Sequence, residues 1–228
     1  RNKLKPNDFI VAKPIDGDCG KGIQFFYPFT KIPKSLINNK KYFFEKYEYG
    51  KNYRIILYKG QIMSIYKRII PFVIGDGKTK VSELVKQINK KRLIRNKIQI
   101  QKEKQNFIPQ KNSKYKVSHL SNFATGGSLK SISLKKIPKK TKKLFIKLQK
   151  ELNINILSID LICSNITHEI NKQETFCINE LEYCNGWGGS YLMKNNFYKL
   201  SKFLLMKYTI LLLVILLIIK LIRRKIMK

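Results

Sequence analysis

The chain has 228 residues, of which 43% are hydrophobic and 11% aromatic, so it can bury a sizeable core and is not a disordered polar chain. Its 47 Lys and Arg residues outnumber 14 Asp and Glu residues, giving a net charge of +33. The lysines are spread over nearly every segment instead of forming one basic patch. We therefore expect non-specific attraction to polyanions, weakened by salt, and no specific nucleic-acid partner.

The four cysteines, Cys19, Cys163, Cys177 and Cys184, form no C-x-x-C pair and show no zinc-site spacing. Free thiols in a reducing compartment are the expectation, which favours a cytoplasmic location. The sequence starts at Arg1, almost directly in a strand pattern, and no signal peptide is visible. We therefore interpret it as a fragment that lacks an N-terminal part.

The first patterned stretch is FIVAKPIDGDCGKGI, residues 9–23. Its apolar start predicts a short buried strand that presents Lys13 at its end, and Pro14 stops the ladder because it has no N–H to donate. A glycine-rich loop follows, whose backbone N–H groups and lysine suit a nucleotide phosphate; its residues are Gly17, Gly20, Lys21 and Gly22. An ordinary β-turn with surface lysines is the alternative.

The next elements predict an antiparallel sheet. Strand patterns cover 23–27 and 42–47, with a polar connection at 28–40, and two further strands at 53–58 and 61–70 form a hairpin. The Gly75-Asp76-Gly77 stretch is expected to end that sheet. Thr79 is expected to cap a helix over about 81–91.

The second half of the chain starts with a basic, weakly patterned region, 91–118, which predicts a loop or an extended arm. SNFATGGS, residues 121–128, is a second glycine loop. A helix is expected from about 139 to 152, with Leu144, Leu148 and Leu152 at helical spacing. Strands are predicted at 153–163 and 175–181.

The tail has a different character. FLLMKYTILLLVILLIIKLI, residues 203–222, has a short uncharged centre, and its flanking lysines, Lys207 and Lys220, are able to snorkel to reach the length of a bilayer crossing. The basic end that follows favours placing that side in the cytoplasm. We expect a membrane helix here, with a buried core helix or a scrambled terminus as alternatives.

Acidic residues are few, so their positions are informative. Asp160 lies in one predicted strand, and Glu180 and Glu182 lie two apart in the next, so the two glutamates point to the same face. If the strands pair, three carboxylates converge. Oxygen ligands of this kind suit Mg²⁺ or Mn²⁺ held together with substrate phosphates. Solvated surface acids paired with lysines are the alternative.

In order, the lysine-bearing strand, the glycine loop, FFEKYEYGKNYR, the hairpin, GDG, SNFATGG, SIDLI and NELEYCNG resemble the ATP-grasp superfamily. The similarity covers about residues 8–190 and is nearest to the cyanophycin synthetase and glutathione synthetase branch, with D-alanine–D-alanine ligases more distant. It implies an α+β ATP-grasp fold with two subdomains that grip ATP between antiparallel sheets. It would span the C-terminal two-thirds of that domain.

The resemblance also implies site residues. Lys13 would contact nucleotide phosphates and adenine, and the glycine loop 17–22 would close over the phosphates. Residues beside the base and ribose would be Glu45, Lys46, Tyr47 and Asn52. Reaction-centre residues would be Arg54, Asn122, Gly126 and Gly127. Metal ligands would be Asp160, Glu180 and Glu182.

Two site positions and one loop depart from the family pattern. Asn52 stands where a ribose-binding acid is usual, and Glu182 stands where the terminal E-x-N motif has Asn, which makes the site more negative. Cys184-Asn185-Gly186 replaces the family's APG, so the substrate-side loop is altered.

The expected organisation is an ATP-grasp domain at 1–190, comprising a mobile glycine-loop part at 9–47 and a C-terminal subdomain at 48–190. A basic linker at 191–202, the hydrophobic segment at 203–222 and a basic tail at 223–228 follow.

The implied reaction is ATP- and Mg-dependent ligation of a carboxylate to an amine or thiol through an acylphosphate. Its partners would be ATP and small carboxylate and amine substrates such as amino acids or peptides, with association at the cytoplasmic face of a membrane through 203–222. A truncated, catalytically impaired ATP-grasp protein that only binds nucleotide is the alternative.

Overall fold

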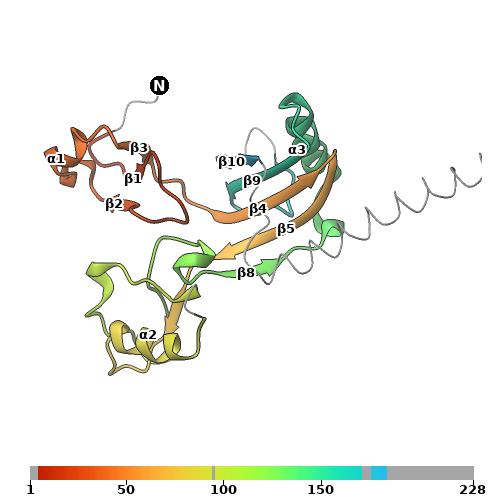
Figure 1. The fold of residues 1–228 in the computed structure, drawn as a ribbon. Helices are drawn as coiled ribbons and strands as arrows, with labels where there is room; N and C mark the ends of the chain where they lie inside the picture. Colours follow the sequence, from red (N-terminus) through yellow and green to blue (C-terminus); the bar gives the residue numbers. More distant parts are fainter. Residues whose placement is uncertain (1–4, 94–95, 171–175, 184–228) are drawn as a thin grey trace, which may run out of the picture.

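A computed structural model describes residues 5–93, 96–170 and 176–183. It is an α+β structure whose strands pair antiparallel throughout, as the sequence predicts. The strands are β1 (Ile10–Pro14), β2 (Gln24–Phe26), β3 (Tyr42–Lys46), β4 (Lys51–Tyr58), β5 (Gln61–Ile69), β6 (Phe72–Ile74), β7 (Lys114–Lys116), β8 (Ser128–Ser131), β9 (Ile156–Cys163) and β10 (Phe176–Tyr183). The α-helices are α1 (Lys34–Ile37), α2 (Val81–Lys90) and α3 (Lys139–Glu151), and the 3₁₀ turns are η1 (Phe29–Lys31), η3 (Lys102–Lys104), η4 (Phe123–Thr125) and η5 (Leu134–Lys136). Figure 1 shows them gathered into three lobes.

The largest lobe is a five-stranded sheet in the order β10-β9-β4-β5-β8. Period-2 alternation gives its central strands one apolar face, on which Ile55, Leu57, Leu157, Ile159 and Leu161 are at most 1% exposed. Helix α3 packs on that face, as its position in Figure 1 indicates. The other face carries Arg54 and Asp160 beside a smaller apolar cluster around Ile56 and Tyr66.

Of the three leucines at helical spacing on α3, only Leu148 packs against the core of the large lobe. Leu144 and Leu152 are 40% exposed, whereas Thr141, Phe145 and Gln149 are buried. Gln149 accepts a hydrogen bond from the N–H of Gly60 at 3.0 Å and donates to the carbonyl of Asn155 at 2.9 Å. The helix is rotated so that Phe145 enters the core and Gln149 ties it to the β4–β5 turn.

The small sheet, β2-β1-β3, forms the second lobe, with Ile10, Ala12 and Ile32 buried inside it. Strand β1 includes both Lys13 and Pro14 and pairs with β3 as far as Pro14 opposite Tyr42. Pro14 is therefore the last residue of β1. The glycine loop connects β1 to β2, as predicted.

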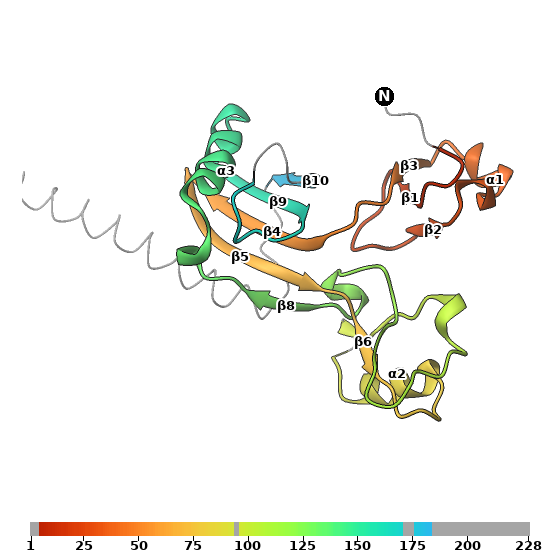
Figure 2. The same ribbon diagram turned by 180° about the vertical axis from the view of Figure 1, so that it is seen from behind.

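A third lobe interrupts the large sheet between β5 and β8. Figure 2 shows its strand β6 and helix α2 below the large sheet. Its own core contains Val73, Val81, Val85, Ile98 and Val117. The region expected to be only a loop or arm thus contributes β7, which pairs with β6, and part of this core.

Thr79 is not the cap of α2, because Lys80 occupies the N-cap position. Asp76 instead accepts from Thr79 Oγ1 at 2.6 Å and from the backbone N–H groups of Lys78 and Thr79 at 2.9 and 2.7 Å. These hydrogen bonds lower the pKa of Asp76 to about 2. The GDG stretch is therefore an Asp-centred turn that precedes the helix.

No helix among residues 5–93, 96–170 and 176–183 is long and apolar enough to cross a membrane. The segment 203–222 lies outside the described residues, as does Cys184. Within them, Cys19, Cys163 and Cys177 are free thiols.

Candidate functional site

The three carboxylates converge on the face of the large sheet opposite α3. Arg54, Asp160 and Glu180 lie in one row across β4, β9 and β10. A bulge at Asn179 shifts the register, and Glu182 follows on the same face opposite Ser158. One carboxylate oxygen from each of Asp160, Glu180 and Glu182 lies within 4.8 Å of the others.

Arginines, not lysines, neutralise this cluster. Arg54 donates from Nε to Asp160 Oδ1 at 2.7 Å and from Nη2 to Asp160 Oδ2 at 2.8 Å, and it also contacts Glu182 Oε1. Arg68, on β5, donates from Nη1 to Asp160 Oδ2 at 2.7 Å. Asp160 is only 5% exposed. The alternative of solvated surface acids paired with lysines is thereby wrong for Asp160.

The charges of the cluster shift its pKa values. Partial burial raises the pKa of Glu180, and the charges of Asp160 and Glu182 raise it further. Burial acts to lower the pKa of Arg54, but its hydrogen bonds and ion pairs with Asp160 and Glu182 outweigh burial and raise it. A cation beside Glu180 would therefore favour its charged form.

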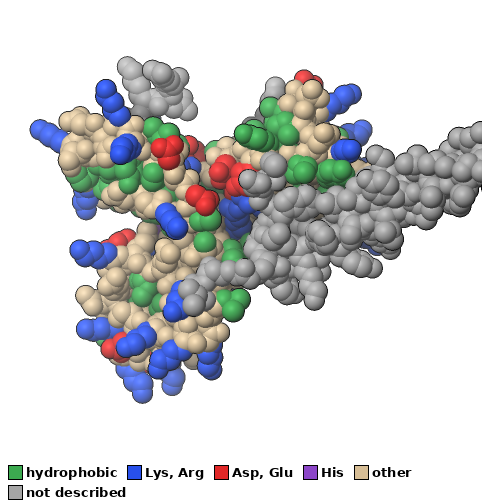
Figure 3. Space-filling model, viewed as in Figure 1, with side chains coloured by type: hydrophobic (Ala, Val, Ile, Leu, Met, Phe, Trp, Pro, Cys, Tyr) green, Lys and Arg blue, Asp and Glu red, His purple; other side chains and the backbone are tan. Residues whose placement is uncertain are grey.

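The donor set fits a hard divalent cation. Three carboxylates offer only oxygen, the ligand atom that Mg²⁺ and Mn²⁺ prefer, and they already lie close enough to share one ion. Figure 3 shows acidic side chains gathered where the lobe of the small sheet meets the large sheet.

Lys13 reaches from the small sheet to the edge of this cluster. Its ammonium contacts Glu45 Oε2 and donates to Asn179 Oδ1 at 2.9 Å, and its side chain is 18% exposed. The ammonium also lies 5.9 Å from the ring centroid of Phe43. One lysine thus joins β3 of the small sheet to the β10 bulge beside the carboxylates.

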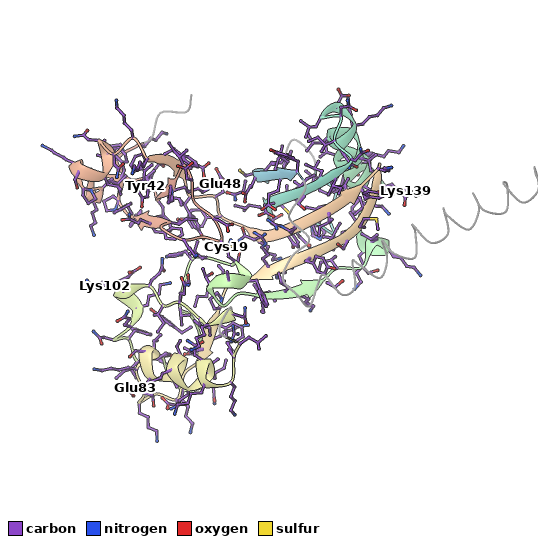
Figure 4. All side chains as sticks on the ribbon, viewed as in Figure 1. Cys19, Tyr42, Glu48, Glu83, Lys102 and Lys139 are labelled. Atoms are coloured by element: carbon purple, nitrogen blue, oxygen red, sulfur yellow. The ribbon has the colours of Figure 1, made fainter. Side chains whose placement is uncertain are left out.

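The glycine loop bends through left-handed backbone at Gly20 and Gly22, with φ of 80° and 73°. Lys21 donates its backbone N–H to the carbonyl of Asp18 at 3.0 Å. A Cβ at Gly20 would lie 3.2 Å from Asn122 Oδ1, and Cβ atoms at Gly17 and Gly22 would meet Pro14. The loop therefore touches the second glycine loop, and Figure 4 shows Cys19 of this loop between the lobes.

The second glycine loop is tightly packed. A Cβ at Gly126, which has a φ of 95°, would lie 2.4 Å from Ile98 Cα, and one at Gly127 would lie 2.3 Å from the carbonyl oxygen of Ser121. Arg92 Nη1 donates to the carbonyl of Gly126 at 2.7 Å. Gly126 and Gly127 therefore shape the loop through their backbone and leave Asn122 to face the cavity.

A cavity of about 890 Å³ lies between the small sheet, the large sheet and the second glycine loop. Among the expected site residues, those that line it are Lys13, Glu45, Lys46, Tyr47, Asn52, Asn122, Asp160 and Glu180. The Lys46 ammonium points to Asp8 at 2.9 Å and its side chain is 57% exposed, so Lys46 is a peripheral member. Glu48, labelled in Figure 4, lines the cavity where the chain passes from one sheet to the other.

An aromatic cluster comprises Phe9, Phe25, Tyr47 and His119, and all of these except Phe9 line the cavity. Tyr47 stacks on Phe9 with ring centroids 4.5 Å apart, and the ring of His119 lies 5.0 Å from that of Phe25. Burial lowers the pKa of His119 to about 4, with a further contribution from the charge of Lys104. His119 lies in a loop, and its neutral ring is partly buried in this cluster.

Sequence reasoning missed Arg68, Asn179 and His119. Arg68 is two residues from Tyr66 and four from Ser64 on β5, so the three side chains share one face of the sheet. That spacing could have placed Arg68 on the site face once the site face of the hairpin was known. Asn179 lies in the bulge of β10 and accepts a hydrogen bond from Lys13, and no sequence pattern predicts that bulge. His119 joins its aromatic partners only through the tertiary fold.

Comparisons with known proteins give partial matches. No family model matches the chain. It is 29% identical over 91 residues to a cyanophycin synthetase of Nostoc sp., covering 35% of this chain and 9% of that protein. It is 24% identical over 199 residues to the glutathione biosynthesis bifunctional protein GshAB of Desulfotalea psychrophila, covering 76% of this chain and 25% of that protein. The chain thus spans at most about a quarter of the length of these curated relatives.

Among solved structures, a bifunctional glutathione synthetase from Pasteurella multocida aligns with a TM-score of 0.49 at 21% identity, covering 82% of this chain and 28% of that chain. In sequence, the chain resembles ATP-grasp ligases of the cyanophycin synthetase and glutathione synthetase kind, which confirms the similarity that its motifs indicate.

Proposed function

We propose that this chain binds ATP with a divalent cation and catalyses ATP-dependent joining of a carboxylate to an amine. The observation that carries the proposal is one cavity that aromatic rings, Lys13 and two members of the carboxylate cluster, Asp160 and Glu180, line together. These groups suit the base, the phosphates and the metal of a nucleotide.

In this proposal the adenine lies against the aromatic cluster, between strands β1–β3 and His119. Tyr47 and the neighbouring backbone of Lys46 border the base, and Glu45 lies beside Lys13. Asn52 lines the same cavity and replaces an acid with a neutral hydrogen-bonding group near the ribose. Adenine is uncharged, and it can be held by stacking on aromatic rings and by hydrogen bonds to amide groups, neither of which requires a charge.

The phosphates then extend toward Lys13 and the glycine loop. The Lys13 ammonium offers positive charge to the transferred phosphoryl group, and the N–H groups of the glycine loop would offer donors, except those of Gly17 and Lys21, which bond to the carbonyls of Pro14 and Asp18. Asp160, Glu180 and Glu182 would hold Mg²⁺ or Mn²⁺, which would neutralise phosphate charge there.

The proposed chemistry has two displacements. A substrate carboxylate oxygen attacks the γ-phosphorus, the bond between that phosphorus and the β–γ bridging oxygen breaks, and ADP leaves with an acylphosphate formed. An amine nitrogen then attacks the acyl carbon, phosphate leaves with its bonding electrons, and the amine proton passes to solvent. The chain contributes positioning and charge compensation, so no side-chain nucleophile is required.

The proposed substrates are small carboxylates and amines of the amino-acid or peptide class, with a thiol as a second acceptor type. The relatives carry this suggestion in their names, cyanophycin synthetase and glutathione biosynthesis protein. Asn122 on the second glycine loop is the side chain that we propose to face them.

A second candidate is nucleotide binding without turnover. Two observations favour it: Asn52 replaces the usual ribose acid, and the arginines already occupy both oxygens of Asp160.

Trapping the acylphosphate separates the two candidates. The full chain is incubated with Mg-ATP, hydroxylamine and pools of amino acids or dipeptides, and hydroxamate and ADP are measured. The ligase proposal predicts substrate-dependent release of both, abolished in Glu180→Gln. Nucleotide binding without either product across the pools supports the second candidate.

A further inference from the structure

The Arg68 side chain is the strongest feature of the cavity that the expected site does not include. It lines the cavity, and its side chain is 15% exposed. Burial lowers the pKa of its guanidinium, and the nearby charge of Arg54 contributes in the same direction. Arginine nonetheless keeps its proton because its pKa starts so high. A partly buried positive group therefore faces the cavity.

The hydrogen bonds of Arg68 leave most of its donors uncommitted. A guanidinium carries five N–H donors in a rigid fork. Within the described residues, Arg68 has one hydrogen bond, from Nη1 to Asp160 Oδ2. Arg54, by contrast, uses both its Nε and Nη2 on Asp160 and also contacts Glu182. Arg54 is the fixed partner of Asp160, and Arg68 is the one with donors to spare.

Asp160 already accepts several hydrogen bonds, which compete with metal binding to its carboxylate. Its two oxygens accept three hydrogen bonds from two cationic groups, and Oδ2 accepts two of them. A cation that approaches this carboxylate meets two positive charges and has to replace an existing hydrogen bond. Glu180, within the part of the chain that the structure describes, is not bonded to either arginine. The cluster is thus partly occupied before any ligand arrives.

We propose that Arg68 is an anion-binding residue of this site. When the nucleotide binds, one of its phosphate groups replaces Asp160 as the hydrogen-bond partner of the Arg68 guanidinium. This inference rests on the proposed function. Arginine binds phosphate through parallel N–H···O bonds, and phosphate offers several oxygens to the donors that Arg68 has free. The exchange releases Asp160 Oδ2 from one of its two arginine contacts. The cation and the nucleotide then bind as a pair, each removing an obstacle for the other.

The exchange predicts that Arg68→Met changes two affinities in opposite directions, that for Mn²⁺ alone and that for the nucleotide complex. Binding of Mn²⁺ alone, followed by electron paramagnetic resonance, becomes about tenfold tighter than in the wild type, because a competing cation is lost. Binding of the Mn²⁺ complex of the imido analogue of ATP, followed by calorimetry, becomes about tenfold weaker, because a charged hydrogen bond to phosphate is lost. A side chain that only supports the fold would weaken both.

Two further variants test whether the effect depends on the guanidinium of Arg68: a conservative replacement and a control at the adjacent residue. Arg68→Lys keeps the charge without the fork, so we expect it to leave Mn²⁺ binding near the wild-type value and to restore part of the nucleotide affinity. Lys67→Met, on the adjacent residue whose side chain points to the opposite face of β5, removes a charge outside the cavity and is expected to change neither affinity.

Each outcome is decisive. Unchanged affinity for the nucleotide complex in Arg68→Met overturns the anion-binding role, and weaker Mn²⁺ binding overturns the exchange. If Arg68→Met loses its fold, judged by circular dichroism, Arg68→Lys decides alone: nucleotide affinity equal to wild type overturns the proposal. If the wild-type chain binds no nucleotide complex, the proposed function fails together with the exchange, whereas wild-type binding that ignores Arg68 removes the exchange only.

Discussion

Arg54 and Asp160 face each other across neighbouring strands and form a two-pronged ion pair, with Nε–Oδ1 and Nη2–Oδ2 distances of 2.7 and 2.8 Å. Their side chains are 10% and 7% exposed. The pair joins β4 to β9 under the carboxylate cluster, so it holds the site face of the sheet in register.

Replacement of Arg54 by Met is expected to destabilise the chain by about 3–5 kcal/mol, because Asp160 would lose its main partner while staying buried. Urea denaturation followed by circular dichroism measures the change. Lys140→Met is the matched control, because the Lys140–Glu169 pair is on the surface, with 78% and 41% of the side chains exposed. An exposed pair of this kind contributes about 0–1 kcal/mol. Equal losses in the two variants would contradict a structural role for the Arg54 pair.

Gly126→Ala is expected to distort the second glycine loop, because its Cβ would lie 2.4 Å from Ile98 Cα and its φ is 95°. Gly60→Ala is the control, since Gly60 has a φ of 77° but nothing within 4 Å of the added Cβ. The control isolates the backbone cost, about 1–2 kcal/mol. We expect Gly126→Ala to lose clearly more stability in urea denaturation. A loss no larger than that of Gly60→Ala would mean that the loop moves away from Ile98 freely.

Much of the fold was readable because its signals are local. Apolar, β-branched runs predicted strands at 53–58, 61–70 and 153–163, which overlap the observed β4, β5 and β9. The i, i+2 spacing of Glu180 and Glu182 placed both on one face. Register was not readable, since the bulge at Asn179 depends on what β10 pairs with.

The rest of the site depends on tertiary packing. The rotation of α3 depends on which side chains fit against the sheet: Phe145 and Gln149 are buried and Leu148 is partly buried, whereas Leu144 and Leu152 are exposed. The partners of Asp160 could not be predicted because lysines greatly outnumber arginines in the sequence, although a buried carboxylate favours the planar guanidinium fork. His119 has no local pattern that announces its place beside Phe9 and Phe25.

His119 gives the stability of the chain a specific pH dependence. Burial lowers its pKa in the folded chain to about 4, below the ordinary histidine value of 6.5. The unfolded chain therefore binds the proton more readily, so the contribution of neutral His119 to stability is complete above pH 6.5 and is lost as pH falls from 6.5 toward 4. Urea denaturation between these pH values measures the loss.

In His119→Gln this part of the pH dependence should disappear, because no group titrates at that position. The exposed His168 provides the control: His168→Gln should keep the wild-type profile. A profile that is the same in all three proteins would show that other groups cause the loss.

The central claim is that Lys13 and the three-carboxylate cluster form one metal-dependent nucleotide site. Calorimetric titration of the full chain with Mg-ATP tests it most directly, beside Lys13→Ala, Glu180→Gln and, as controls, Lys40→Ala and Glu83→Gln, whose side chains are exposed outside the cavity. Loss of one charged contact to phosphate or metal is expected to weaken binding about tenfold or more. The account predicts binding that requires Mg²⁺, is weakened in the two site variants and is unchanged in the two controls. Absence of binding to a folded wild-type chain, or equal affinity in all five proteins, would contradict it.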